Sequence, residues 1–105
     1  MTLVSIVTTM KFEWDENKRL INLQRHGIDF ADVWQVFESN RVIFTDDRFD
    51  YNELRFVTIG VLRERLVTVI YTENDEITRI ISVRKATKNE RRKYLKGIAN
   101  RLGEN

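Results

Sequence analysis

Several arginines in this sequence fall on segments that are otherwise typical of β-strands. Arg55 lies in a β-rich run at residues 54–61, and Arg79 and Arg84 lie in another at 77–84. Guanidinium groups are rarely buried in a sheet, so these positions suggest its rim, where forked donors can hold phosphate oxygens. We therefore predict a phosphate-binding groove. The residues expected to bind the ligand are Arg79, Lys85, Arg63, Arg65 and Tyr71.

Simpler interpretations stay open for the same side chains. The arginines could form rim ion pairs with nearby glutamates, which are common and contribute little stability when exposed. Tyr71 could stack on a base, as aromatic rings do with single-stranded RNA, or be an ordinary strand aromatic. Because several basic residues cluster, we favour the functional interpretation for the group. The candidate ion-pair partners are Glu53, Glu64, Glu73 and Glu76.

Few side chains in the sequence suit proton transfer. His26 is the only histidine, and imidazole suits acid and base work in RNA cleavage; before Gly27 it could equally stabilise a helix C-terminus. Glu90 lies near Arg84 in sequence, although a helix cap also explains it. The predicted catalytic residues are Arg84, Arg55, His26 and Glu90.

Composition argues against several classes of site. The sequence has no cysteine and one histidine, so disulfides, thiolate ligands and His-rich zinc sites are not expected. A carboxylate magnesium site is not excluded by such counts. The sequence contains no Walker loop, dinucleotide-binding glycine turn or nucleophile elbow. We predict no metal and no cofactor.

Charge is divided unevenly along the 105 residues. Residues 11–54 carry 6 Lys or Arg against 10 Asp or Glu, and residues 55–105 carry 12 against 6, which gives net charges of −4 and +6. Concentrated positive charge is typical of proteins that bind a polyanion or an acidic partner. A solvated helix face is the alternative explanation for the C-terminal part.

Caps and apolar spacing predict the element that precedes the arginines. Asp15 can cap a helix that runs to His26, with Leu20 and Leu23 facing inward and Gly27 ending it. A second helix is expected after a cap at residue 29, because apolar residues then recur three and four positions apart. The stripe of this second helix consists of Phe30, Val33, Trp34 and Phe37.

Strand-like runs fill the middle of the sequence. Short turns at Arg63-Glu64 and Asn74-Asp75 should join the last three runs into an antiparallel meander. Strict alternation would place Arg84 with Ile80 on one face of the last strand, and Arg79 with Val83 on the other. The runs are at residues 42–44, 54–61, 65–72 and 77–84.

A last helix begins at a capping box formed by Thr87 and Glu90. Its inward stripe is expected to be Leu95, Ile98, Ala99 and Leu102. With 42% hydrophobic residues, the chain suits one domain. The predicted fold class is α+β, with two N-terminal helices, an antiparallel sheet of about four strands and a C-terminal helix.

Six blocks of sequence between residues 11 and 96 carry a resemblance to a known family. They are Phe12-Glu13-Trp14-Asp15-Glu16-x-Lys18, Asn22-x-x-Arg25-His26-Gly27-Ile28-x-Phe30, Glu53-x-Arg55-Phe56-x-x-Ile59-Gly60, Arg65-Leu66-Val67, Tyr71-Thr72 and Arg79-Ile80-Ile81-Ser82-Val83-Arg84-Lys85-Ala86-Thr87-x-x-Glu90-Arg91-x-x-Tyr94. In this order the blocks resemble the BrnT family of type II toxin–antitoxin toxins, within the wider RelE/ParE-like superfamily. The family often has Lys where Arg25 stands and Ala where Val83 stands.

This resemblance implies a RelE-like fold and a cytoplasmic bacterial toxin that cleaves RNA without a metal to inhibit translation. It also implies a BrnA-like ribbon-helix-helix antitoxin that carries the indirect contact with operator DNA. Attack of a ribose 2′-hydroxyl on the adjacent phosphate is the expected chemistry. The alternatives are a non-catalytic ParE-like toxin that blocks a protein such as gyrase, and a harmless nucleic-acid-binding accessory domain.

Residues 1–10 lie outside the resemblance. They contain no Lys or Arg and no small-residue cleavage site, as a secretory signal would, and they are too short to span a bilayer. Either an upstream start codon or an extra edge strand would explain them. We predict an N-terminal extension at residues 1–10, a single BrnT-like domain at 11–105, and no association with membranes.

Overall fold

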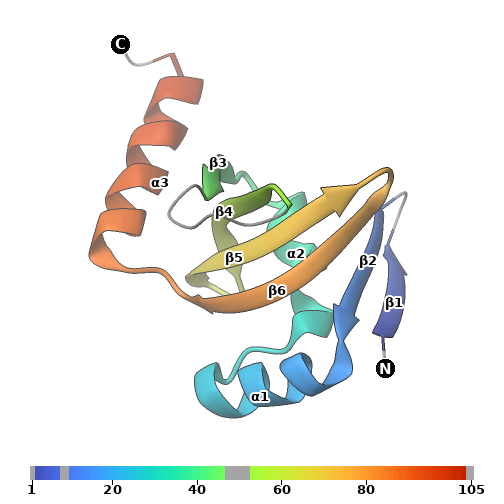
Figure 1. The fold of residues 1–105 in the computed structure, drawn as a ribbon. Coiled ribbons are helices and arrows are strands. Elements are labelled where there is room, and N and C mark those ends of the chain that lie inside the picture. Colours follow the sequence, from blue (N-terminus) through green and yellow to red (C-terminus); the bar gives the residue numbers. More distant parts are fainter. Residues whose placement is uncertain (1, 8–9, 47–52, 104–105) are drawn as a thin grey trace.

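A six-stranded sheet forms the centre of the computed structural model, which describes residues 2–7, 10–46 and 53–103 (Figure 1). Its strand order is β1-β2-β6-β5-β4-β3. The strands are β1 (Thr2–Val7), β2 (Met10–Asp15), β3 (Val42–Asp46), β4 (Arg55–Leu62), β5 (Arg65–Asn74) and β6 (Ile77–Lys85). The helices are α1 (Glu16–His26), α2 (Trp34–Glu38) and α3 (Lys88–Arg101), with a 3-10 turn, η1, at Phe30–Asp32.

The α+β class is confirmed, but the prediction of about four antiparallel strands is wrong. Strand β2 joins the sheet beside β6 in parallel orientation, so the sheet is mixed. Strand β1 then pairs antiparallel with β2 and becomes an edge strand, one of the two explanations for the first ten residues. Local alternation could not show these pairings, because they depend on contacts between distant parts of the chain.

The meander of β4, β5 and β6 is confirmed. Arg63 and Glu64 both have positive φ, 49° and 68°. Two-residue hairpin turns favour this conformation at both central positions, because its twist matches that of the flanking strands. In the second hairpin Asn74 still belongs to β5, and the turn begins at Asp75, whose φ is 55°.

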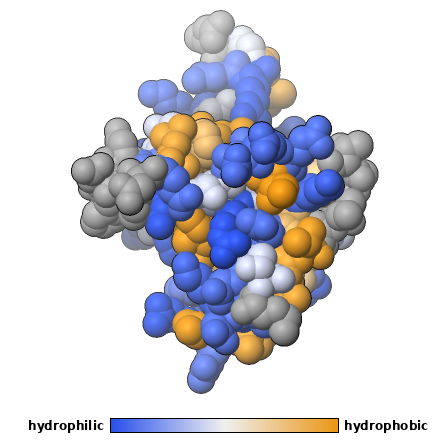
Figure 2. All heavy atoms as spheres, turned by 45° about the vertical axis from the view of Figure 1, so that its right-hand side comes forward, coloured by the Kyte–Doolittle hydropathy of each residue, from blue (hydrophilic) through white to orange (hydrophobic). Residues whose placement is uncertain are grey.

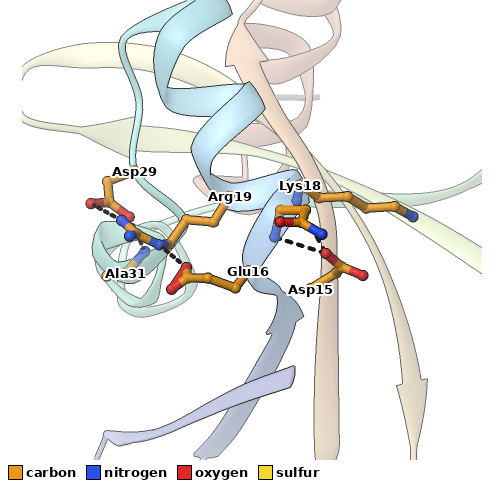
Figure 3. A network of polar contacts seen from close by, with 7 residues as sticks. Asp15, Glu16, Lys18, Arg19, Asp29 and Ala31 are labelled. Atoms are coloured by element: carbon orange, nitrogen blue, oxygen red, sulfur yellow. Dashed lines mark hydrogen bonds and ion pairs between the residues drawn. The ribbon is translucent and has the colours of Figure 1, made fainter. Parts of the chain in front are cut away.

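Helix α1 begins and ends where the sequence predicts. The Asp15 carboxylate accepts hydrogen bonds from the amides of Asn17 and Lys18, and Gly27 ends the helix with a φ of 70°. Figure 3 shows Arg19 pointing toward Glu16 and Asp29, whereas Lys18 points away from these contacts. The ion pair with Asp29, at 2.9 Å, fixes α1 to the segment that follows it.

The predicted inward face of α1 is wrong. Leu20 and Leu23 are exposed, and the buried residue of the helix is Asn22. Its side-chain amide donates to the carbonyl of Ile28 at 3.0 Å, and its oxygen accepts from the amide of Val83 at 3.2 Å. Strand β2 pairs only with the first half of β6, so α1 contacts the free edge of the second half. The backbone amides and carbonyls of a free edge need hydrogen-bond partners, which Asn22 supplies and a leucine does not.

The predicted second helix is divided into two pieces. Asp29 caps η1 rather than a long helix, because the amides of Asp32 and Val33 bond to carbonyls three residues earlier. The apolar stripe predicted for this helix is still buried in the core, except for Trp34, which is only partly buried. The core cluster contains Phe12, Trp14, Ile28, Phe30, Val33, Val36, Phe37, Leu62, Val67, Val69, Tyr71, Ile80 and Val83.

Helix α3 has the predicted capping box but only part of the predicted inward stripe, because Ile98 and Ala99 are half-buried whereas Leu95 and Leu102 are exposed. Leu95 is 60% exposed and Leu102 is 72% exposed, and no residue of the helix is buried. The helix rises from the end of β6 and extends away from the sheet (Figure 1). It contacts β3 where Gly97 lies against Val42, since a Cβ at Gly97 would lie 2.6 Å from a Val42 methyl carbon.

Polar and apolar side chains are interspersed on the face that Figure 2 presents. Within the described ranges, no helix is long and apolar enough to cross a membrane.

Replacing Asn22 with Ala should destabilise the protein by about 2 kcal/mol, because the Val83 amide and the Ile28 carbonyl would both lose their buried partner. Urea unfolding at neutral pH measures the change, and the exposed Gln24→Ala substitution on the same helix is the control. An Asn22→Ala midpoint equal to that of the control would contradict the role of Asn22 at the β6 edge.

Candidate functional site

A register shift between β5 and β6 decides where the arginines lie. Ile70 pairs with Ser82 but Tyr71 pairs with Ile80, so Ile81 is an extra residue on β6. Beyond it, Val83 faces the same side as Ile80, and both are buried in the core. The predicted alternation along this strand is therefore wrong.

The shift places Arg79 and Arg84 on the same face of the sheet. Their partners on β5 are Thr72 and Thr68, four residues apart, which lie on one side of that strand. Arg55 joins them, because Val57, two residues later, pairs with Ile70. We call this the arginine face, and the opposite side, with the core cluster, the core face.

Arg84 is held by a two-pronged ion pair with Glu90. Its two terminal nitrogens donate to the two carboxylate oxygens at 2.7 and 2.8 Å. Glu90 Oε1 also accepts from the Thr68 hydroxyl and the Thr87 amide, each at 2.9 Å. The pair thus connects β5, β6 and the first turn of α3 at one point.

These contacts keep Glu90 ionised. Burial by itself would raise its pKa, but the hydrogen bonds from Arg84, the Thr87 amide and Thr68 outweigh that effect and lower the pKa to about 2. In this arrangement the carboxylate has little affinity for a proton at neutral pH. While these hydrogen bonds hold, Glu90 orients Arg84, and it takes up a proton readily only once they are lost.

A hollow opens on the arginine face beside this ion pair. Lys93 contributes a second cation, 4.8 Å from the centre of the Phe44 ring, and Asp46 contributes a second, buried carboxylate. Lys93 and Asp46 were not among the predicted site residues. The position of Lys93 was a usable signal, because it lies one helical turn after the predicted residue Glu90. The Arg84 hollow is lined by Phe44, Thr45, Asp46, Val57, Ile70, Arg84, Glu90 and Lys93.

The other two arginines of this face lie outside the Arg84 hollow. Arg79 pairs with Glu13 of β2 at 3.1 Å, as the ion-pair interpretation allowed, but with a glutamate that it did not name. Arg55 is half-buried and stands opposite Asp46 in the pairing of β3 with β4.

Three of the expected binding residues do not converge with them. Lys85 pairs with Val67, so its side chain lies on the core-face side of β6. Arg63 and Arg65 flank the β4–β5 turn, where Arg63 pairs with Asp32 of η1 at 3.3 Å. The single groove predicted for all these residues does not form, because strand alternation puts Lys85 and Arg65 on the core-face side and Arg63 pairs with η1.

Tyr71 is part of the core. It is 1% exposed, and its ring packs between Phe37 and Phe56. Burial raises the pKa of its hydroxyl, which accepts a hydrogen bond from Arg41 at 3.3 Å. No face of this ring is open to a base.

His26 lies in a separate hollow beside α1 that shares no residue with the Arg84 hollow. Asn22, four residues before His26, bonds to the backbone through both ends of its side-chain amide. The α1 hollow is lined by Lys18, Ile21, Asn22, Arg25, His26, Ile81 and Ser82. In the parts of the chain that the structure describes, no three His, Cys, Asp or Glu side chains gather as metal ligands would.

Comparison with known proteins adds one match. Residues 14–90 match the family model described as ribonuclease toxin, BrnT, of type II toxin-antitoxin system. The matched segment includes all three residues of the arginine face, and Glu90 is its last residue. No curated protein matched the chain.

Replacing Glu90 with Gln should destabilise the protein by about 2 kcal/mol at neutral pH, after allowance for solvent screening of the pair. A carboxylate with a lowered pKa stabilises the fold above its ordinary value of 4.5, and this contribution is lost as the pH falls toward 2. The difference in unfolding free energy between parent and variant should shrink over that interval.

Urea unfolding at several pH values between 2 and 7 measures this difference. Glu64→Gln, in the exposed β4–β5 turn, is the matched control and should change stability by less than about 0.5 kcal/mol. A Glu90→Gln effect that stayed constant down to pH 2 would contradict the ion-pair explanation.

Proposed function

Because the chain belongs to the BrnT family of ribonuclease toxins of type II toxin–antitoxin systems, we propose that its arginine face holds the RNA phosphate at which the strand is cut. RNA is then the target of the toxin, and the cognate antitoxin is its partner. The observation that carries the proposal is the β6 register shift, which places Arg79 and Arg84 on one face, the face that Arg55 of β4 also occupies.

The Arg84 hollow supports a position for the scissile phosphate. Arg84 and Lys93 line it from β6 and α3, so two cations can approach one phosphate group. Glu90 fixes the plane of the Arg84 guanidinium before substrate arrives, and donors aligned in advance stabilise developing charge most effectively. Arg55, on the neighbouring part of the same face, is the second charge-stabilising group in this proposal.

The proposed chemistry is attack of the ribose 2′-hydroxyl on the adjacent phosphorus, without a metal. The 2′-hydroxyl gives its proton to a carboxylate base, the bond from phosphorus to the 5′-oxygen breaks, and that oxygen takes up a proton and leaves as a hydroxyl, while the other product carries a 2′,3′-cyclic phosphate. A phosphate that draws Arg84 away from Glu90 also removes hydrogen bonds that lower the pKa of Glu90, which makes this carboxylate a better base. Asp46, the second carboxylate of the hollow, is the other candidate; His26 lies in the α1 hollow.

We also propose the kind of antitoxin that binds this chain, the place where the pair acts and the bounds of the toxin domain. The antitoxin would be a BrnA-like ribbon-helix-helix protein that carries the operator contacts, and the pair would act in the cytoplasm. Helix α3 supports a protein partner, because Leu95 and Leu102 leave apolar surface exposed that association would cover. Residues 11–105 would form the toxin domain and residues 1–10 its extension.

Arg84→Ala should lower RNA cleavage by about 100-fold, the usual effect of removing one donor to a developing negative charge. The assay uses toxin freed of antitoxin and labelled RNA in EDTA, and product ends are analysed for cyclic phosphate. Arg84→Lys should keep part of the activity, since it keeps charge but not the forked geometry. Arg101→Ala, near the exposed end of α3, should match the parent.

Products with 3′-hydroxyl ends, or cleavage only with added magnesium, would overturn the proposed chemistry. Toxicity that depends on Arg84 without any RNA cleavage would instead favour a ParE-like block of a protein target. Circular dichroism of each variant separates loss of activity from loss of fold.

A further inference from the structure

The α1 hollow brings together three basic side chains, Lys18, Arg25 and His26. Across residues 2–7, 10–46 and 53–103, neither Lys18, Arg25 nor His26 forms an ion pair. By contrast, Arg19 of the same helix is paired with Glu16 and Asp29. The three side chains are exposed and line one concave surface, where Lys18 and Arg25 present positive charge to an incoming ligand and His26 lies beside them.

Helical spacing explains why these residues gather. Lys18, Asn22 and Arg25 are separated by four and three positions, which places them on one side of α1. Asn22 then fixes that side to the edge of β6 through its contact with the Val83 amide. The floor of the hollow is therefore anchored to the strand that carries Arg84.

The α1 hollow and the Arg84 hollow are neighbours across β6. Ser82 lines the first and Ile70 lines the second, and these two residues are direct partners in the pairing of β6 with β5. Ser82 also lies on the arginine face, on the same side as Arg84. Ser82 thus gives an RNA strand in the Arg84 hollow a path along one face of the sheet to Lys18 and Arg25.

We infer that the α1 hollow binds a second phosphate of the RNA strand that is cut at the Arg84 hollow. This inference rests on the proposed function and assigns Lys18, Arg25 and His26 to substrate binding rather than to catalysis. An acidic protein segment would be the competing ligand for a basic surface. The continuity of the hollow with the arginine face favours the nucleic acid.

The test measures binding of labelled, non-cleavable 2′-O-methyl oligonucleotides of increasing length by fluorescence anisotropy. Arg25→Gln is compared with Arg101→Gln, which removes the same charge near the end of another helix. For long oligonucleotides, Arg25→Gln should weaken binding about 3- to 10-fold and reduce the slope of log affinity against log salt by about 0.7, the value for one single-strand phosphate contact. For the shortest that bind, the two variants should be equal.

Three other outcomes would contradict the second phosphate site, and one of them would also contradict the proposed function. If the parent binds RNA but Arg25→Gln and Arg101→Gln agree at every length, the second phosphate site is wrong and the proposed function stands. Equal weakening at every length would place Arg25 at the scissile phosphate and overturn a separate subsite. A parent that binds no oligonucleotide but captures an acidic peptide through Arg25 would overturn both the inference and the proposed function.

Discussion

One extra residue in β6 determines the geometry of the whole candidate site. A regular strand would place Arg79 and Arg84 on opposite sides, and one of them would point into the core cluster. The shift at Ile81 lets Ile80 and Val83 both fill the core while the two arginines share the other face. Apolar packing on one side thus sets the arrangement of charge on the other, so the site cannot change without a cost to the core.

The ion pair of Arg84 with Glu90 connects that sheet to α3. Four donors converge on one carboxylate, and they come from two strands and the helix start. Because no residue of α3 is buried, this polar junction and the contact of Gly97 with Val42 account for much of its attachment. The same contacts that hold the helix also orient the guanidinium, so stability and preorganisation of the site depend on one group.

Features governed by neighbours in sequence were predictable, and those governed by distant contacts were not. Asp15, Gly27 and the capping box at Thr87 act within a few residues, so their side chains alone indicate the helix ends. Which side of α1 or α3 is buried depends on the element that the helix packs against. Helix α1 packs against a free edge of β6, so Asn22 is buried there and Leu20 is exposed. The arginines of the site were predictable by type, but their common face depends on a strand irregularity that periodicity does not reveal.

The parallel pairing of β2 with β6 has a consequence for the order in which the protein can assemble during synthesis. These strands lie 66 positions apart in register, since Glu13 pairs with Arg79, and pairings between such distant segments form late because the intervening chain must first be ordered. Arg84 and Glu90 follow β1 to β5 in sequence, so a nascent chain that has reached only β5 lacks the ion pair that orients Arg84. Arg84 therefore reaches its place only when β6 joins the sheet, and the same strand forms the longest-range strand pairing of the described residues.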